Sequence, residues 1–253
     1  MGKVTIRYTD PTPISRIGEM AGLCWDADTT DEIKNYKRGL DCLKSRHGRT
    51  WEFPDTTLVL EGYSARVIRE LYTHIGGAPT RLQESTRYVD GANFEYIIPE
   101  KIAKNKDPLA LAVYEKTMDD IRRGIKTLES CGVHKEDAAM LLPLGMTTKV
   151  VVKMNFRTLA HMAQERLCTR AYYEFRQLIK DIGAALSEIS VEWETLVDDY
   201  FIPKCERDGY CVERYCCGHM PKLVDLQNEL NESSSCSCGN GGECSCGGNC
   251  TCK

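Results

Sequence analysis

The chain has 253 residues, of which 42% are hydrophobic and 28% are charged, and this composition excludes disordered and fibrous proteins. Its formal charge is −4, from 33 basic and 37 acidic residues, which argues against a basic surface for nucleic acid. The sequence has neither an apolar run of about 18 residues nor an apolar signal sequence at its start. We therefore expect a cytoplasmic protein without membrane or nucleic-acid partners.

The first hundred residues are expected to mix short strands with helices. Alternating or β-branched residues predict three strands, at residues 4–8, 56–60 and 94–98. Thr29 and Glu32 form a capping-box pattern, which predicts a helix that ends at Gly48. Ser64 is expected to cap another helix over residues 65–74.

The later part of the fold is expected to contain longer helices. An Asp107-Pro108 start predicts a helix that runs to Gly132, with apolar residues at helical spacing. Residues 147–154 include three consecutive valines and predict a strand buried on both faces, after which Asn155 should cap one long helix. A short helix should end before Pro203. Because strands and helices do not alternate regularly, we predict an α+β fold with a mixed or antiparallel sheet and long helices.

The distribution of the fourteen cysteines divides the chain. Four of them lie singly in apolar patterns and are expected to be small buried hydrophobes: Cys24, Cys42, Cys131 and Cys168. The other ten follow residue 204. We therefore predict a catalytic domain at 1–203, a Cys-containing segment at 204–230 and a flexible Cys/Gly-rich tail at 231–253.

Two groups of late cysteines are candidate metal ligands. The tail holds three C-x-C pairs, formed by Cys236, Cys238, Cys244, Cys246, Cys250 and Cys252. Paired thiolates of this kind can chelate a soft metal such as Zn(II) or Cu(I), and the alternative is a thiol-rich extension that binds nothing in particular. The upstream group comprises Cys205, Cys211, Cys216, Cys217 and His219. Its spacing matches no standard zinc finger, so local packing is the favoured interpretation there.

Two segments place cationic residues in or beside apolar elements, which is a typical feature of anion sites. The first segment has His74, Arg81, Ser85 and Arg87 in a predicted loop, where hydroxyl and guanidinium groups suit a phosphate; solvated charges or ion pairs are the alternative.

The second segment lies near the start of the predicted long helix and contains Asn155, Arg157, His161, Arg166 and Arg170. Arg157 and His161 share a helix face, whereas Arg157 and Arg166 point in roughly opposite directions. If both arginines bind ligand, the site lies between subunits or the helix is broken. An ordinary amphipathic helix with arginines outside is the alternative.

Together these segments resemble the flavin-dependent thymidylate synthases, over roughly residues 1–203. The shared features are S-x-R-Y at residues 85–88 with FEYIIP after it, LPL before the valine strand, and an N-x-R…R-(x)4-A-x-x-E pattern formed by Asn155, Arg157, Arg166, Ala171 and Glu174.

The resemblance implies an α+β homotetramer whose active sites are shared between subunits. It also implies reductive methylation of deoxyuridine monophosphate to thymidylate. The one-carbon unit would come from methylenetetrahydrofolate, and the hydride from reduced flavin adenine dinucleotide (FAD) that NADPH regenerates. Two alternatives stay open: a flavin-dependent pyrimidine nucleotide hydroxymethylase, and a metal-binding thiol-rich protein on an inactive synthase scaffold.

The resemblance also assigns site residues. The catalytic residue would be Arg166, whose guanidinium would stabilise negative charge on the uracil ring. Substrate-binding residues would be Gln83, Glu84, Ser85, Thr86, Arg87 and Arg166. Flavin-binding residues would be Thr50, Glu52, His74, Arg81, Asn155, Arg157 and His161.

Three departures from the family pattern affect these assignments. The R-H-R signature is here Thr73, His74 and Ile75, so we expect Arg81 to replace a missing charge. Ala139 stands where a phosphate-binding arginine is expected. Glu70 replaces a glutamine, and we expect it to turn away or to pair with one of two neighbouring arginines, Arg66 or Arg69.

Overall fold

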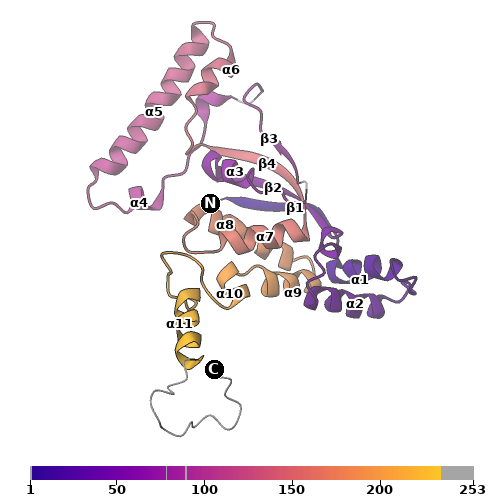
Figure 1. Cartoon of the computed structure of the whole chain (residues 1–253). Helices are drawn as coiled ribbons and strands as arrows, with labels where there is room; N and C mark the ends of the chain where they lie inside the picture. Colours follow the sequence, from indigo (N-terminus) through magenta and orange to yellow (C-terminus); the bar gives the residue numbers. More distant parts are fainter. Residues whose placement is uncertain (1, 78, 89, 235–253) are drawn as a thin grey trace, which may run out of the picture. The chain divides into compact units, whose positions relative to one another are not determined.

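The computed structural model describes residues 2–77, 79–88 and 90–234, and it divides the chain into two compact units. The first unit is Met1–Pro203 and the second begins at Lys204. In the first unit, helices pack against a four-stranded sheet (Figure 1).

The sheet is antiparallel throughout, with strand order β1-β2-β4-β3. Its strands are β1 (Lys3–Thr9), β2 (Asp55–Ser64), β3 (Thr80–Gln83) and β4 (Thr147–Asn155). The central β2–β4 pair sets Leu58 opposite Val152 and Leu60 opposite Val150, and all four side chains are buried. The predicted α+β class and the strands expected at 4–8, 56–60 and 147–154 are confirmed.

The prediction that β4 is buried on both faces is wrong. Burial alternates along the strand: Val150 and Val152 are buried, whereas Lys149 and Lys153 are exposed. The two lysines pair across the open face with carboxylates of β2, Lys149 with Glu61 and Lys153 with Asp55, each at 2.7 Å. The run of valines therefore does not require a second covering layer.

Two further strand predictions need correction. Residues 94–98 form no strand; Tyr96 makes only an isolated bridge to Met146. A 3-10 turn at Gly91–Asn93 and the helix that follows Pro99 leave too short an extended segment. Conversely, β3 lies within the segment that was expected to be a loop.

The helices of the first unit are α1 (Pro13–Leu23), α2 (Glu32–Lys44), α3 (Ala65–Leu71), α4 (Glu100–Ala103), α5 (Leu109–Ser130), α6 (Lys135–Ala138), α7 (Phe156–Arg166), α8 (Tyr173–Ser187) and α9 (Val191–Tyr200). Three short 3-10 helices are η1 (Thr50–Glu52), η2 (Gly91–Asn93) and η3 (Ala139–Leu141). The predicted long helix after Asn155 is two helices, α7 and α8.

Side-chain caps explain where several helices begin. Ser64 and Asn155 accept hydrogen bonds from the third residue after each of them, as predicted. The prediction of Thr29 as a cap is wrong, because Asp31 accepts from the Lys34 amide at 3.1 Å and α2 starts after it. Helix α3 also ends at Leu71, three residues earlier than expected.

The main core is formed by side chains of the sheet and of helices α1, α2, α3, α7, α8 and α9. Figure 1 shows α7 and α8 beside the sheet. Its largest fully buried side chains include Trp193, Phe156 and Phe175. Of the four cysteines expected to be buried, only Cys42 is; Cys24 and Cys131 are exposed and Cys168 is half-buried. The exposed pair lies at helix ends, beyond the packed stripe, so the prediction is wrong for both.

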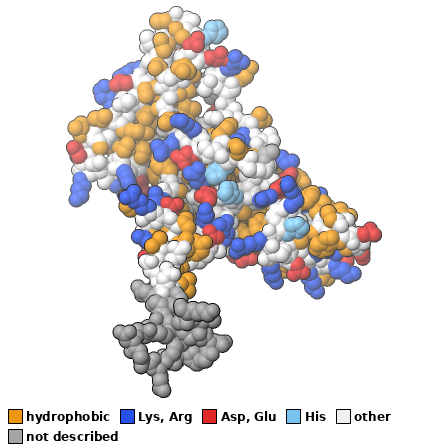
Figure 2. Space-filling view, in the orientation of Figure 1, with side chains coloured by type: hydrophobic (Ala, Val, Ile, Leu, Met, Phe, Trp, Pro, Cys, Tyr) orange, Lys and Arg blue, Asp and Glu red, His pale blue; other side chains and the backbone are white. Residues whose placement is uncertain are grey.

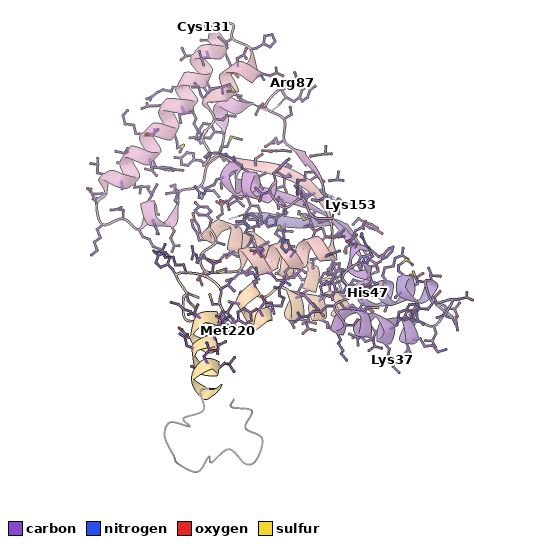
Figure 3. All side chains as sticks on the ribbon, viewed as in Figure 1. Lys37, His47, Arg87, Cys131, Lys153 and Met220 are labelled. Carbon is purple, nitrogen blue, oxygen red and sulfur yellow. The ribbon has the colours of Figure 1, made fainter. Side chains whose placement is uncertain are left out.

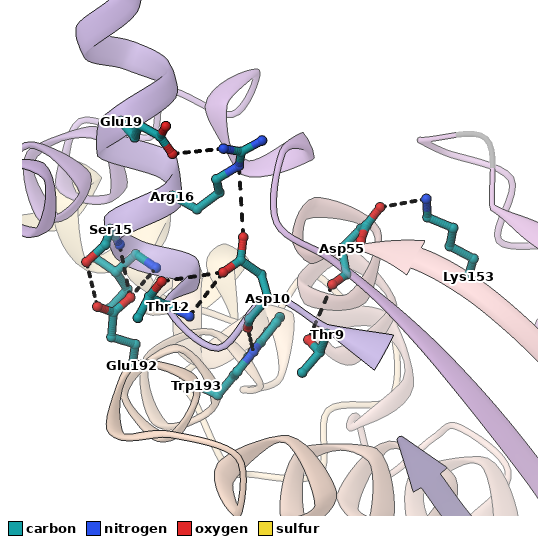
Figure 4. A network of polar contacts seen from close by, with 11 residues as sticks. Thr9, Asp10, Thr12, Ser15, Arg16, Glu19, Asp55, Lys153, Glu192 and Trp193 are labelled. Atoms are coloured by element: carbon teal, nitrogen blue, oxygen red, sulfur yellow. Dashed lines mark hydrogen bonds and ion pairs between the residues drawn. The ribbon is translucent and has the colours of Figure 1, made fainter. Parts of the chain in front are cut away.

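Helices α1 and α2 cross at very close range. A Cβ atom at Gly18 would lie 1.8 Å from the Asn35 carbonyl oxygen, so only glycine allows this approach. The start of α1 is fixed by Glu192 of α9, whose carboxylate accepts from the amides of Ile14 and Ser15 at 2.7 and 2.9 Å (Figure 4). These contacts attach the α1–α2 hairpin to the core.

A second, smaller core surrounds α5 and contains Phe94, Met118, Ile125 and Ala138. Hydrophobic side chains also gather on the surface over this part (Figure 2). They include Leu109, Val113, Met140, Leu141 and Leu144.

The second unit contains α10 (Lys204–Asp208) and α11 (Leu223–Ser234). Helix α11 continues through Ser234, so the first four residues of the predicted tail, 231–234, are helical. The tail cysteines from Cys236 to Cys252 lie outside the described residues. Within residues 2–77, 79–88 and 90–234, no three His, Cys, Asp or Glu side chains converge as metal ligands, and no helix is long and apolar enough to span a membrane.

Candidate active site

Arg166, the last residue of α7, is held by the end of α3 and by the turn that follows it. Its Nε donates to His74 Nε2 at 2.9 Å, its Nη1 lies 3.4 Å from Glu70 Oε2, and its Nη2 donates to Thr73 Oγ1 at 3.4 Å. The guanidinium also lies over the Phe175 ring, with its carbon 4.9 Å from the ring centroid. The last turn of α3 and the turn after it therefore contact the predicted catalytic arginine on all three of its nitrogens.

His74 is almost fully buried, with 9% of its surface exposed. Its ring packs against Phe175 and His161, at centroid distances of 5.8 and 6.3 Å. Burial, reinforced by the positive charge of Arg166, lowers the pKa of His74 to about 4. The imidazole is therefore neutral near pH 7 and accepts the hydrogen bond from Arg166.

Glu70 shares its carboxylate between two arginines. Arg66, one turn earlier on α3, lies 3.7 Å from Oε1, and Arg166 lies 3.4 Å from Oε2. The expected pairing with Arg66 is confirmed, and the contact with Arg166 was not foreseen. The guanidinium carbon of Arg66 lies 4.3 Å from the centroid of the Tyr172 ring. The start of α8 therefore packs against this group of charges.

Arg81 projects from β3 towards the same turn. Its Nη2 donates to the backbone oxygen of His74, and its guanidinium lies 5.0 Å from the Tyr72 ring centroid. Burial lowers its pKa. Arg81 thus supports the backbone at His74, and its predicted flavin contact stays a prediction.

A buried carboxylate joins α8 to the start of α3. Glu174 accepts from the Ser64 amide and from Ser64 Oγ, both at 2.6 Å, and only 6% of its surface is exposed. Because Ser64 Oγ also accepts from the Val67 amide, the cap of α3 is itself fixed by α8. These hydrogen bonds fix α8 relative to α3, and so they position the Phe175 ring against His74 and Arg166.

The predicted flavin residues near α7 form a second group. Arg157 donates to Glu52 at 2.6 Å, and Arg49 donates to the other oxygen of Glu52 at 2.8 Å. The hydrogen bond from Arg157 holds the pKa of Glu52 below its usual value. Thr50, by contrast, is buried and donates to the His47 carbonyl, so its hydroxyl already has a structural partner.

Asn155 and His161 differ in how accessible they are. The Asn155 side chain caps α7 by accepting from the Thr158 amide at 2.9 Å, and the Thr158 hydroxyl donates to the Gly76 carbonyl at 2.6 Å. Gly77 has a φ of +74°, and a Cβ atom there would lie 2.4 Å from the Thr158 hydroxyl. This close approach therefore depends on glycine. His161 is exposed, and its ring lies 6.3 Å from the His74 ring, steeply inclined to it at 68°.

The predicted nucleotide segment lies elsewhere, along a cavity of about 200 Å³ that follows β3. Glu84, Ser85 and Thr86 line this cavity, whereas Arg87 forms an ion pair with Glu136. Gln83 donates to Thr148, which also lines it, at 3.5 Å.

The acidic character of this cavity was missed. Glu84, Asp90 and Glu95 all line it, and no Arg, Lys or His does so among the described residues. Asp90 and Glu95 could have been suspected from their position just after S-x-R-Y. The partner of Arg87, Glu136, had no sequence signal because it lies far along the chain.

The predicted residues thus fall into three groups within one chain. His74 and Arg81 join Arg166; Glu52 joins Arg157; and Glu84 and its two neighbours line the β3 cavity. Figure 3 shows Arg87 close to the α5–α6 end of the unit, and His47, whose carbonyl accepts from Thr50, near α2. Helix α7 is continuous from Arg157 to Arg166, so the helix is not broken between the two arginines; the break before α8 comes only after Arg166.

Comparison with known proteins decides the family. The family of thymidylate synthase complementing proteins matches residues 5–190. The chain belongs to this family. The chain is similar to the flavin-dependent thymidylate synthase of Nitratidesulfovibrio vulgaris, with 34% identity over 210 residues that cover 78% of this chain and 82% of the relative. The enzyme of the same name from Clostridium tetani is 29% identical over 246 residues, 88% of this chain and 96% of the relative.

Solved structures agree with this family at the level of the fold. Thymidylate synthase X from Helicobacter pylori, crystallised with FAD and deoxyuridine monophosphate, has a TM-score of 0.59 and 18% identity, covering 78% of this chain and 99% of that one. The UMP/dUMP methylase PolB from Streptomyces cacaoi has a TM-score of 0.63 and 16% identity, covering 80% and 97%. The resemblance identified from the sequence is confirmed.

Proposed function

We propose that this protein makes thymidylate by reductive methylation of deoxyuridine monophosphate with flavin as the hydride donor. The observation that carries the proposal is the fixed guanidinium of Arg166 in a chain of this family. A positive group held by three protein contacts needs little reorganisation when negative charge develops on a bound uracil ring. Arg166 would therefore stabilise the ring as its carbon five attacks the one-carbon unit.

The β3 segment is the proposed nucleotide site. Ser85 and Thr86 line a cavity of suitable character for sugar hydroxyls, with Glu84 as an acceptor. Gln83 and Arg87 flank it, and Arg87 would have to leave Glu136 to reach a phosphate. Since carboxylates line the cavity, a phosphate bound there needs cations from another source.

A second copy of the chain is that proposed source. The Arg157 and Arg166 groups belong to other parts of the same unit, and neither lines the β3 cavity. We propose a homotetramer in which one subunit supplies the nucleotide segment and another supplies arginines. The exposed apolar side chains over α5 and η3 are consistent with a subunit contact.

The group formed by Arg49, Glu52 and Arg157 fits an anionic flavin cofactor. Two guanidinium groups share one carboxylate, so the group carries a positive excess that suits the pyrophosphate of FAD. Exposed His161 and the amide of Asn155 would add hydrogen-bond donors. Thr50, His74 and Arg81 would support the wall of the pocket without contacting the phosphates. Reduced flavin supplies a hydride when bound.

The co-substrates and the tail complete the proposal. NADPH would reduce the flavin and methylenetetrahydrofolate would donate the one-carbon unit. The six tail cysteines, Cys236 to Cys252, would bind a soft metal such as Zn(II) or Cu(I) separately from catalysis.

The experiment that tests the function is an incubation of the purified chain with FAD, NADPH, methylenetetrahydrofolate and deoxyuridine monophosphate, with the product measured by mass. Thymidylate is expected, and Arg166→Ala should abolish it. Arg123→Ala, which removes an exposed arginine of α5, is the matched control and should stay active. A hydroxymethyl product or no product would refute the proposal.

A further inference from the structure

We infer that His74 acts as a positioning residue for Arg166, its buried ring holding the guanidinium instead of contacting the flavin. The inference rests on the proposed function, because it concerns the arginine of that same site. It departs from the resemblance, which assigns His74 to the flavin.

The hydrogen bond between the two side chains defines the state of His74. Arg166 Nε can only donate, so His74 Nε2 must accept at 2.9 Å and the ring must carry its single hydrogen on Nδ1. An imidazolium ring has no free acceptor, and its charge would repel the guanidinium. The contact therefore requires a neutral histidine, which burial and the neighbouring arginine both favour.

The surroundings of the ring leave little room for a ligand. Phe175 and His161 pack against it, and Arg81 donates to the backbone oxygen of the same residue. With 9% of its surface exposed, His74 lies beneath the site surface, whereas 25% of the Arg166 side chain remains exposed. The arginine is thus the member of the pair that faces a ligand.

Among the three contacts of Arg166, the hydrogen bond that it donates to His74 is the shortest, at 2.9 Å. The contacts with Glu70 and Thr73 are both 3.4 Å, near the outer limit of a hydrogen bond. Glu70 is also shared with Arg66. His74 therefore contributes most to fixing the plane of the guanidinium.

The number of free donors indicates what the positioned arginine binds. A guanidinium has five N–H groups, and three are directed at His74, Glu70 and Thr73. One N–H on each terminal nitrogen remains. Such a pair suits a planar ligand edge with carbonyl acceptors, as on a pyrimidine ring, and its orientation depends on the Nε contact.

Two substitutions separate positioning from packing. In His74→Gln, the amide oxygen can reach the place of Nε2 and preserve the acceptor. In His74→Asn, the shorter side chain cannot. Both remove the ring, so they share any loss of packing against Phe175.

The positioning role predicts different kinetics for the two variants. His74→Asn should lower kcat about 10- to 100-fold, the effect of leaving a charged donor without its partner. His74→Gln should stay within a few fold of the parent, and both should bind FAD as the parent does. In an Arg166→Lys background, which lacks the Nε–H donor, the two variants should be equal.

A spectroscopic readout tests the inference even if the proposed reaction fails. The Nε–H resonance of Arg166, assigned by its loss in Arg166→Lys, should exchange slowly with water in the parent and in His74→Gln, and rapidly in His74→Asn. Equal exchange in both variants, or a selective loss of FAD affinity in both, would overturn the positioning role. Absence of turnover with the expected exchange pattern would count against the proposed function alone.

Discussion

Glu174→Ala should destabilise the first unit, because it removes the buried hydrogen bonds between Glu174 of α8 and Ser64 at the start of α3. In the parent, the carboxylate accepts two hydrogen bonds of 2.6 Å from Ser64, and the pair is buried. Bonds to a charged acceptor contribute about 1.5–3 kcal/mol each. After substitution the Ser64 hydroxyl can turn towards another acceptor, but its amide hydrogen stays buried without a partner. We therefore expect a loss of about 3 kcal/mol in the free energy of unfolding.

For a domain of about 200 residues, that loss corresponds to a fall of about 6–12 °C in Tm. Urea unfolding at equilibrium, followed by circular dichroism, measures the free energy directly. Glu174→Gln, which keeps one acceptor oxygen, should lose about half as much. Glu188→Ala, at the exposed end of the same helix, should change stability by less than about 0.5 kcal/mol. A Glu174→Ala protein as stable as Glu188→Ala would refute the reasoning.

Three other predictions concern separate parts of the chain. Gly18→Ala should cost at least about 3 kcal/mol of stability, since its Cβ would meet backbone of α2, whereas Gly124→Ala on α5 should stabilise by about 0.5–1 kcal/mol. The unfolding free energy should fall as pH drops from about 6.5 to about 4, because unfolded His74 binds a proton that the folded protein, with a pKa of about 4, excludes. Deleting residues 235–253 should leave thymidylate formation unchanged and remove bound soft metal.

Each of these predictions has its own measurement and control. Urea titration compares the two glycine variants, and equal effects would contradict the helix-crossing argument. The pH effect should be flatter in His74→Gln, and an equal pH dependence in that variant would contradict the argument. Elemental analysis of full-length and shortened protein decides the metal question, and metal retained without the tail would contradict the assignment.

Local signals in the sequence predicted much of the scaffold. The caps at Ser64 and Asn155 depend on neighbouring residues only, so they could be identified without tertiary information. The sheet strands with β-branched residues were recognised for the same reason. The capping-box pattern pointed to Thr29, whereas Asp31 caps α2 by accepting from the Lys34 amide; both residue types are common N-caps, so the pattern alone does not distinguish them.

The contacts of the site were less predictable because they join residues far apart in the chain. The sequence pattern identified Arg166 and His74 separately, but their hydrogen bond spans 92 positions. The break after Arg166 was also missed, since apolar residues at helical spacing continue across it into α8. Burial of one face of β4 depends on where the helices lie, and the valine run carries no such information.

The strand order has a consequence for biosynthesis. Strand β2 lies between β1 and β4, yet roughly ninety residues separate its last residue, Ser64, from the end of β4 at Asn155. At about 5–20 residues per second, a ribosome needs about 5–20 s to make that stretch. Throughout that time one edge of β2, including Leu58 and Leu60, has no pairing partner and is open to association with other nascent chains. Yield in the cell should therefore depend on chaperones that act while the chain is still attached to the ribosome.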